Sequence, residues 1–166
     1  CNIAKYTSED DCRGLADAEL MATELPDLDL YHPWDITAEQ AIEKAIECEN
    51  SAREFDPRII NSDGASVSTY SGLSVYANSH GFAAVSSSSS HSLSCSVIAN
   101  EANGEGMQRD FWYSSSRIGD RLESPGSVGK RAAEETLSRL DSRKLSSRKS
   151  PVLYVPHLAS GLIGHF

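Results

Sequence analysis

Long apolar segments are missing from this sequence. No apolar run approaches the roughly 18 residues that a membrane-spanning helix needs. The chain also does not open with the basic and then apolar segments of a secretory signal peptide. We therefore expect a soluble protein that works in the cytoplasm and has no membrane partner. Because the chain begins at a cysteine rather than at methionine, a targeting segment ahead of it stays an open alternative.

Cysteine is scarce as well. The sequence has four cysteines, and no two of them form a C-x-x-C pair. Two of them, Cys48 and Cys95, occupy positions on predicted apolar faces. The pattern is typical of free, buried thiols in a reducing cytoplasm, and we expect that state here.

Positive charge is the third deficit. The formal net charge is -9, and the first 56 residues hold 15 of the 24 acidic residues but only 4 of the 15 lysines and arginines. An acidic chain repels phosphate backbones, whereas nucleic-acid-binding proteins usually present a basic face. The one basic cluster, residues 143–149, is more typical of a solvated loop than of a phosphate site. We therefore expect no nucleic-acid partner.

The length, 166 residues, suits one domain with a sizeable core. The chain has no initiator methionine at its start, and it stops at Phe166 inside an apolar run without a helix stop signal. These two features predict that the sequence is a fragment of a longer protein.

The segment from Gly64 to Ala99 carries the clearest pattern that is present. Apolar and serine residues alternate along its last third, which is typical of a half-buried strand. We expect three or four short antiparallel strands with turns at residues 63–64, 71–72 and 79–81. The serine run from Ser86 to Ser90 is expected at a hairpin end. The small polar serines of the outward parity would suit a groove that accepts an extended chain by edge pairing.

Two helices are predicted to cover this sheet. The first runs from Thr37 to Phe55, opens with a capping box from Thr37 to Gln40 and stops at Pro57. The second opens at Ser124-Pro125 and runs to Leu140. The predicted fold class is α+β, a two-layer domain with a mainly antiparallel sheet from about Ile59 to Arg117. A short helix from Asp10 to Thr23 and a short buried strand from Pro151 to Val155 are also predicted.

The last eleven residues hold the only arguable chemistry. A strand, a break and a helix in that order would place Ser160, Gly161 and His165 on a helix that leaves a sheet edge. A serine beside a histidine suggests a nucleophile, but no acidic residue is placed to orient the histidine and the G-x-S-x-G elbow is absent. A catalytic zinc takes about three protein ligands, and His157 and His165 supply two.

Several of these stretches together resemble a known family. They match the PmbA/TldE-type members of the TldD/PmbA metalloprotease family, which are also labelled modulators of DNA gyrase. The matching runs are Asn78–Gly81, His91–Ala99, Leu137–Leu140, Arg143–Ser146 and Gly161–His165. The resemblance implies a bacterial, cytoplasmic protein in which a TldD-like partner subunit helps to degrade unfolded or extended peptides. It also implies an N-terminal α+β domain over residues 1–145 and, over residues 146–166, the start of a truncated metalloprotease-like domain.

The resemblance carries one informative departure. In TldD-like subunits the corresponding helix carries His-Glu-x-x-x-His, in which the histidines bind zinc and the glutamate acts as general base. In this chain Ser160 stands at the first histidine, Gly161 at the glutamate and His165 at the second histidine. The resemblance therefore implies no catalytic or metal-binding residue in this chain, no cofactor of its own, and zinc in the TldD-like partner. The alternatives are a self-sufficient metallopeptidase and a gyrase-associated modulator.

Overall fold

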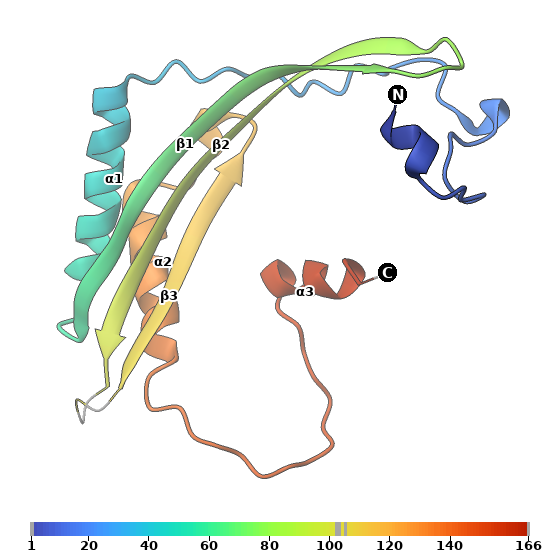
Figure 1. Ribbon diagram of the computed structural model, residues 1–166. Coiled ribbons are helices and arrows are strands. Elements are labelled where there is room, and N and C mark those ends of the chain that lie inside the picture. Colours follow the sequence, from blue (N-terminus) through green and yellow to red (C-terminus); the bar gives the residue numbers. More distant parts are fainter. Residues whose placement is uncertain (1, 102–103, 105, 166) are drawn as a thin grey trace.

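A three-stranded antiparallel sheet with two helices on one of its faces forms the body of the molecule (Figure 1). The computed structural model describes residues 2–101, 104 and 106–165. The strands are β1 (Ile59–Ala77), β2 (Ala83–Asn100) and β3 (Met107–Ser116), in the order β1-β2-β3. The covering helices are α1 (Ala38–Arg53) and α2 (Pro125–Ser138). The predicted α+β class, with its mainly antiparallel sheet and two helices, is confirmed.

The strands are longer and fewer than the prediction of three or four short ones. β1 and β2 pair from Ala77 with Ala83 down to Ile59 with Ala99, so the region forms one long hairpin. The turns predicted at residues 63–64 and 71–72 are wrong, because both pairs lie inside β1. At the first of them the chain makes a bulge, with Gly64 at a φ of 101°, and then continues the ladder. Only the turn at residues 79–81 is confirmed, and its Gly81 has a φ of 87°.

The serine run is also placed differently from the prediction. Ser86–Ser90 lies within β2 and pairs with residues 70–74 of β1, so it does not form a hairpin end. Serine can adopt an extended conformation as well as a turn. Pairing with a long partner strand supplies hydrogen bonds to the backbone of the extended serine run. The hairpin end is instead residues 78–82, where the Asn78 amide donates to the Phe82 carbonyl at 3.0 Å.

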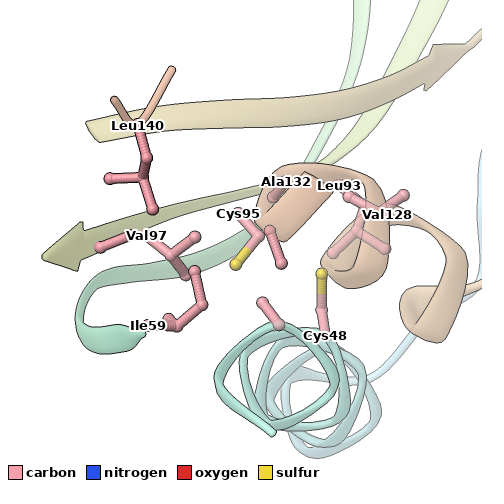
Figure 2. Packing of buried hydrophobic residues seen from close by; sticks show 11 residues of the cluster. Cys48, Ile59, Leu93, Cys95, Val97, Val128, Ala132 and Leu140 are labelled. Carbon is pink, nitrogen blue, oxygen red and sulfur yellow. The ribbon is translucent and has the colours of Figure 1, made fainter. Parts of the chain in front are cut away.

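The core lies between the sheet and the two helices (Figure 2). The inward parity of β2 supplies Leu93, Cys95, Val97 and Ala99, each at most 2% exposed. The helices contribute mostly small residues, namely Cys48 and Ala52 from α1 and Val128, Ala132 and Ala133 from α2. Ile59 and Leu140 close the cluster. Small residues on both helices let them pack closely against each other and against the sheet.

Both helix starts are confirmed. The Thr37 hydroxyl accepts from the Gln40 amide at 3.3 Å, and the Gln40 side chain accepts from the Thr37 amide at 3.1 Å. Ser124 caps α2 by accepting from the Ser127 amide, and Pro125 follows it. The apolar face of α1 is narrower than its pattern indicates, since Ile42 and Ile46 are 57% and 54% exposed.

Two predicted elements at the ends of the chain are wrong. The helix from Asp10 to Thr23 is replaced by turns and a short 3-10 helix, Ala18–Leu20, in an exposed segment with no buried residue. A helix of this length needs a packing partner, and this segment has none in the described ranges. The strand from Pro151 to Val155 is an exposed stretch without ladder pairing. Two more 3-10 helices are Ile3–Tyr6 and Gly119–Arg121.

A last helix, α3 (Pro156–Ile163), follows a long exposed segment (Figure 1). Cys1 and Phe166, which bound the two predicted domains, lie outside the described residues, as do three residues of the loop between β2 and β3. In the part of the chain that is described, none of the helices combines the length and the apolar character needed to cross a membrane.

Candidate functional site

Helix α3 carries two of the three predicted motif positions. Ser160 and Gly161 lie on it, and both are exposed. The helix ends at Ile163 with Gly164 as its C-cap, so exposed His165 lies in the turn that follows. The structure therefore brings Ser160 and Gly161 together on one helix and leaves His165 just beyond it. The helix does not leave a sheet edge as predicted, because the segment before it is not a strand.

The residues at these positions do not fit a zinc centre. Glycine has no side-chain donor, a serine hydroxyl is not among the usual zinc ligands, and one histidine alone does not hold the ion. Within residues 2–101, 104 and 106–165, no three His, Cys, Asp or Glu side chains come together in a way that could hold a metal. The other candidate, His157, packs its ring edge-on against Trp112 with 5.5 Å between ring centroids.

The same residues do not assemble general acid-base chemistry. Three glutamates of α1, Glu39, Glu43 and Glu47, have exposed side chains. The arrangement around α3 holds a hydroxyl and an imidazole, but no carboxylate is hydrogen-bonded to that imidazole among the described contacts. What α3 offers chemically is an exposed helix surface, not a reacting centre.

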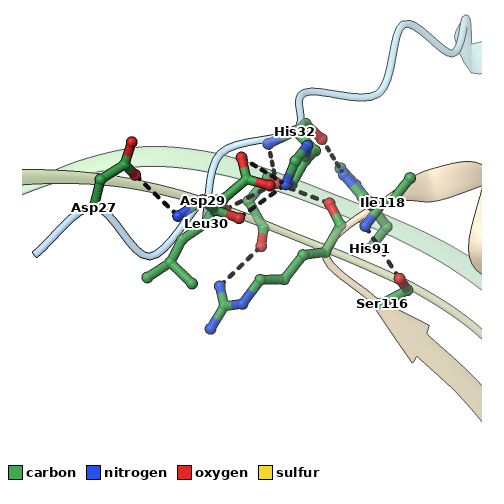
Figure 3. Close-up of polar contacts among 9 residues, drawn as sticks. Asp27, Asp29, Leu30, His32, His91, Ser116 and Ile118 are labelled. Atoms are coloured by element: carbon green, nitrogen blue, oxygen red, sulfur yellow. Dashed lines mark hydrogen bonds and ion pairs between the residues drawn. The ribbon is translucent and has the colours of Figure 1, made fainter.

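A buried histidine at the middle of the sheet fixes the segment that precedes α1 (Figure 3). His91 on β2 is fully buried, and its Nδ1 lies 2.8 Å from the Thr69 hydroxyl. Its Nε2 lies 2.9 Å from the His32 carbonyl oxygen, which only accepts, so Nε2 carries the proton in this pair. Trp34 packs edge-on against the His91 ring at 5.5 Å.

Ser89, two residues earlier on the same strand face, strengthens this attachment. Its backbone amide donates to the Leu30 carbonyl at 2.9 Å, and its hydroxyl oxygen accepts from the His32 amide at 2.8 Å. The same hydroxyl donates to the Arg117 carbonyl at 2.9 Å. The residue pair Ser89 and His91 therefore ties three segments together: the stretch before α1, the centre of β2 and the end of β3.

Neither Ser89 nor His91 is predicted as a site residue from the sequence. In the sequence, His91 stands out only as the start of the run His91–Ala99 that carries the family resemblance, and Ser89 is expected in a hairpin end. The signal was present in the alternation, because His91 and Ser89 share the parity of Leu93, Cys95 and Val97 and so belong to the buried face. His32 is a loop residue, and both its backbone amide and its carbonyl oxygen are held at this site.

Two surface hollows flank the sheet. One, of about 530 Å³, lies between residues 25–31 and the Val85–Ser87 stretch of β2. The other, of about 490 Å³, lies at the opposite end of the hairpin, where Arg109 pairs with Asp63 at 3.1 Å and Arg139 pairs with Asp110 at 2.7 Å. The charged side chains of the second hollow pair with one another. The second hollow therefore does not offer a ligand a cluster of charges of one sign.

The outer surface of the sheet is open. Serines of the outward parity run along β2, and the exposed side chains of Tyr70, Phe111 and Tyr113 lie on its neighbours. In the described ranges β1 and β3 each pair with β2 alone, so each has one free edge of backbone donors and acceptors. Such an edge can accept an extended peptide as an additional strand.

Comparisons with known proteins point to one family. The family model described as PmbA/TldA metallopeptidase central domain matches residues 31–140. Over 164 residues the chain is 48% identical to a Haemophilus influenzae protein named metalloprotease PmbA homolog and 46% identical to metalloprotease PmbA of Escherichia coli. Each alignment covers 99% of this chain and 36% of the relative. The chain thus spans about a third of the length of these curated relatives.

A solved structure agrees with these matches. It comes from Bacteroides thetaiotaomicron and is named as a candidate modulator of DNA gyrase. The superposition gives a TM-score of 0.74 at 28% sequence identity and covers 87% of this chain and 33% of that chain. The long hairpin and its two covering helices are therefore an arrangement that this protein shares with a solved structure.

Proposed function

This chain belongs to the PmbA/TldD metallopeptidase family, and on that premise we propose that it is the central part of a non-catalytic subunit of a zinc metalloprotease. The protease would be bacterial and cytoplasmic, and would degrade unfolded or extended peptides together with a TldD-like partner. Residues 146–166 would begin the C-terminal, metalloprotease-like domain of this subunit. Zinc would reside in the partner.

One observation carries the proposal. Ser160 and Gly161 lie on exposed helix α3, and the family resemblance assigns them to the positions where TldD-like subunits carry a zinc ligand and the general base. Without the base no group activates a metal-bound water, and without the ligand the affinity for zinc falls. His165, in the turn after the helix, would then serve the subunit's structure or its contact with the partner.

The open sheet supports the substrate class. Free strand edges bind an extended chain through backbone hydrogen bonds, which every peptide sequence offers. The outward serines of β2 are small and leave room for varied side chains, while Tyr70, Phe111 and Tyr113 offer apolar contact. A subunit of this kind would hold an unfolded peptide near the zinc of the partner without cutting it.

The test uses the full-length protein that contains this chain and its TldD-like partner, purified separately. We expect hydrolysis of casein or of an unstructured peptide to require the partner and to increase when this subunit is added. Ser160→Ala in the full-length protein should leave the activity of the mixture unchanged, because the hydroxyl has no catalytic role. The matched control replaces the motif glutamate of the partner with glutamine and should abolish hydrolysis. Turnover by the full-length protein alone would overturn the proposal.

A further inference from the structure

Two buried thiols face each other between helix α1 and the central strand (Figure 2). Cys48 on α1 is 0% exposed, and Cys95 on β2 is 1% exposed. Both cysteines are free, and both belong to the same buried cluster, in which their side chains point toward one another. Cys12, by contrast, is free and exposed in the N-terminal segment. The function proposed above uses neither of the two buried thiols.

The pairing makes the two sulfurs unequal. The side-chain interaction with Cys95, together with burial, raises the pKa of Cys48. The same interaction lowers the pKa of Cys95, against the opposing effect of burial. The first proton that the pair loses therefore comes from Cys95. A thiolate is the nucleophilic form of cysteine, and here it has a second thiol beside it.

We propose that Cys48 and Cys95 are a reversible disulfide site, formed on oxidation by a peroxide, that covalently joins α1 to β2. The Cys95 thiolate attacks one peroxide oxygen, the O–O bond breaks, and Cys95 becomes a sulfenic acid as the first water is released. The Cys48 sulfur then attacks the sulfenic sulfur and loses its proton, and the second water leaves. In total two thiols and one hydrogen peroxide give one disulfide and two waters. An external dithiol returns both cysteines to the reduced state.

The surroundings of the pair favour closure over further oxidation. The neighbouring core side chains from the helices include Ala52, Ala132 and Ala133, which are small. A sulfenic acid at Cys95 meets the Cys48 sulfur before it meets a second peroxide, because the two cysteines lie in the same buried cluster. The bond would connect the first covering helix to the central strand across 46 intervening residues and so restrict the unfolded chain.

The experiment maps the bond in the full-length protein that contains this chain. The protein is treated with hydrogen peroxide, the remaining thiols are alkylated under denaturing conditions, and a tryptic digest is analysed without reduction. Trypsin places Cys48 in the peptide 45–53 and Cys95 in the peptide 59–109. We expect these two peptides as one linked species that dithiothreitol separates. We also expect the oxidised protein to unfold at a higher urea concentration than the reduced protein.

Two matched variants complete the design. Cys12→Ser should leave the linked species in place, because Cys12 is exposed and remote from the pair in the sequence. Cys48→Ala should remove the linked species and the oxidation-dependent shift in the urea midpoint. The proposal is overturned if the wild-type digest yields the two peptides separately, each alkylated or oxidised to the sulfinic acid, or if either cysteine is linked to Cys12.

Discussion

At the scale of single residues, Gly129 decides how closely the two covering helices approach. A Cβ at this position would overlap the Cys48 carbonyl oxygen of α1, which belongs to rigid helix backbone. We expect Gly129→Ala to lower the free energy of unfolding by about 1–3 kcal/mol, because the helices must move apart over a packed core. Urea unfolding of the variant and of the wild type measures this loss.

Gly126 is the matched control for that substitution. It lies one turn earlier on the same helix, and a Cβ there would meet only the Ser51 hydroxyl at 3.7 Å, an ordinary contact. Gly126→Ala should therefore stay within about 1 kcal/mol of the wild type, with the higher helix propensity of alanine in its favour. Equal losses for the two variants would show that the close approach of α1 and α2 is not the cause.

The residue pair Asp56 and Arg58 predicts a pH dependence at the start of β1. Hydrogen bonds from the Arg58 side chain and from its backbone lower the pKa of Asp56 to about 2 from its usual 3.8. A carboxyl group whose pKa is lower in the folded state stabilises the protein above its unfolded pKa and loses that effect as it becomes protonated. We expect the stability difference between wild type and Asp56→Asn to be full above about pH 4 and to shrink as the pH falls towards 2.

The measurement is a series of urea unfolding curves from pH 5 to pH 2 for both proteins. Asp11→Asn provides the control, because Asp11 is an exposed aspartate in a segment without buried residues. Its unfolding curves should follow those of the wild type over the whole range. A stability difference for Asp56→Asn that does not change with pH would contradict the role assigned to Arg58.

At the scale of elements, the start of α1 depends on its capping box. Thr37 and Gln40 satisfy each other's backbone amides, so removing the hydroxyl leaves one donor of the first turn without its partner. We expect Thr37→Ala to lower the free energy of unfolding by about 1 kcal/mol. Thr37→Ser keeps the hydroxyl and should cost clearly less. If thermal unfolding shows equal losses for the two variants, the cap does not stabilise the helix.

The elements also show how far sequence reasoning reaches. The two covering helices were predictable because their caps and apolar spacing are local signals. The parity of β2 was predictable from Leu93, Cys95 and Val97 for the same reason. The length of the strands was not predictable from the sequence. Gly64 and Gly72 are typical turn residues, but here they pair with β2 and so lie inside strand β1. That pairing joins Gly64 to Ser96 and Gly72 to Ser88, which are 32 and 16 positions apart, and local patterns do not report such distant partners.

The predictions for the two ends of the chain were wrong because local patterns there have no tertiary partner. The patterns at residues 10–23 and 151–155 resemble a helix and a strand, but in the described structure nothing packs against them. A short segment rarely holds regular structure without a tertiary partner. The motif positions on α3 were located by resemblance, whereas the buried site at Ser89 and His91 could have been inferred from parity alone.

At the scale of the whole molecule, the proposed role is that of one subunit in a protease of two. The chain spans about a third of its curated relatives, and its open sheet and exposed α3 leave surfaces on which further protein could pack. The central claim of the proposed function is that this subunit supports peptide hydrolysis without holding the zinc itself. The claim rests on Ser160 and Gly161, because neither residue can take the place of a ligand or a base.

The zinc content of the full-length protein tests that claim most directly. The protein is purified alone, equilibrated with zinc, dialysed against metal-free buffer and analysed for bound metal, with its TldD-like partner treated in parallel. We predict far less than one zinc per chain for this subunit and close to one zinc per chain for the partner. One zinc per chain that stays with this subunit through dialysis would contradict the account.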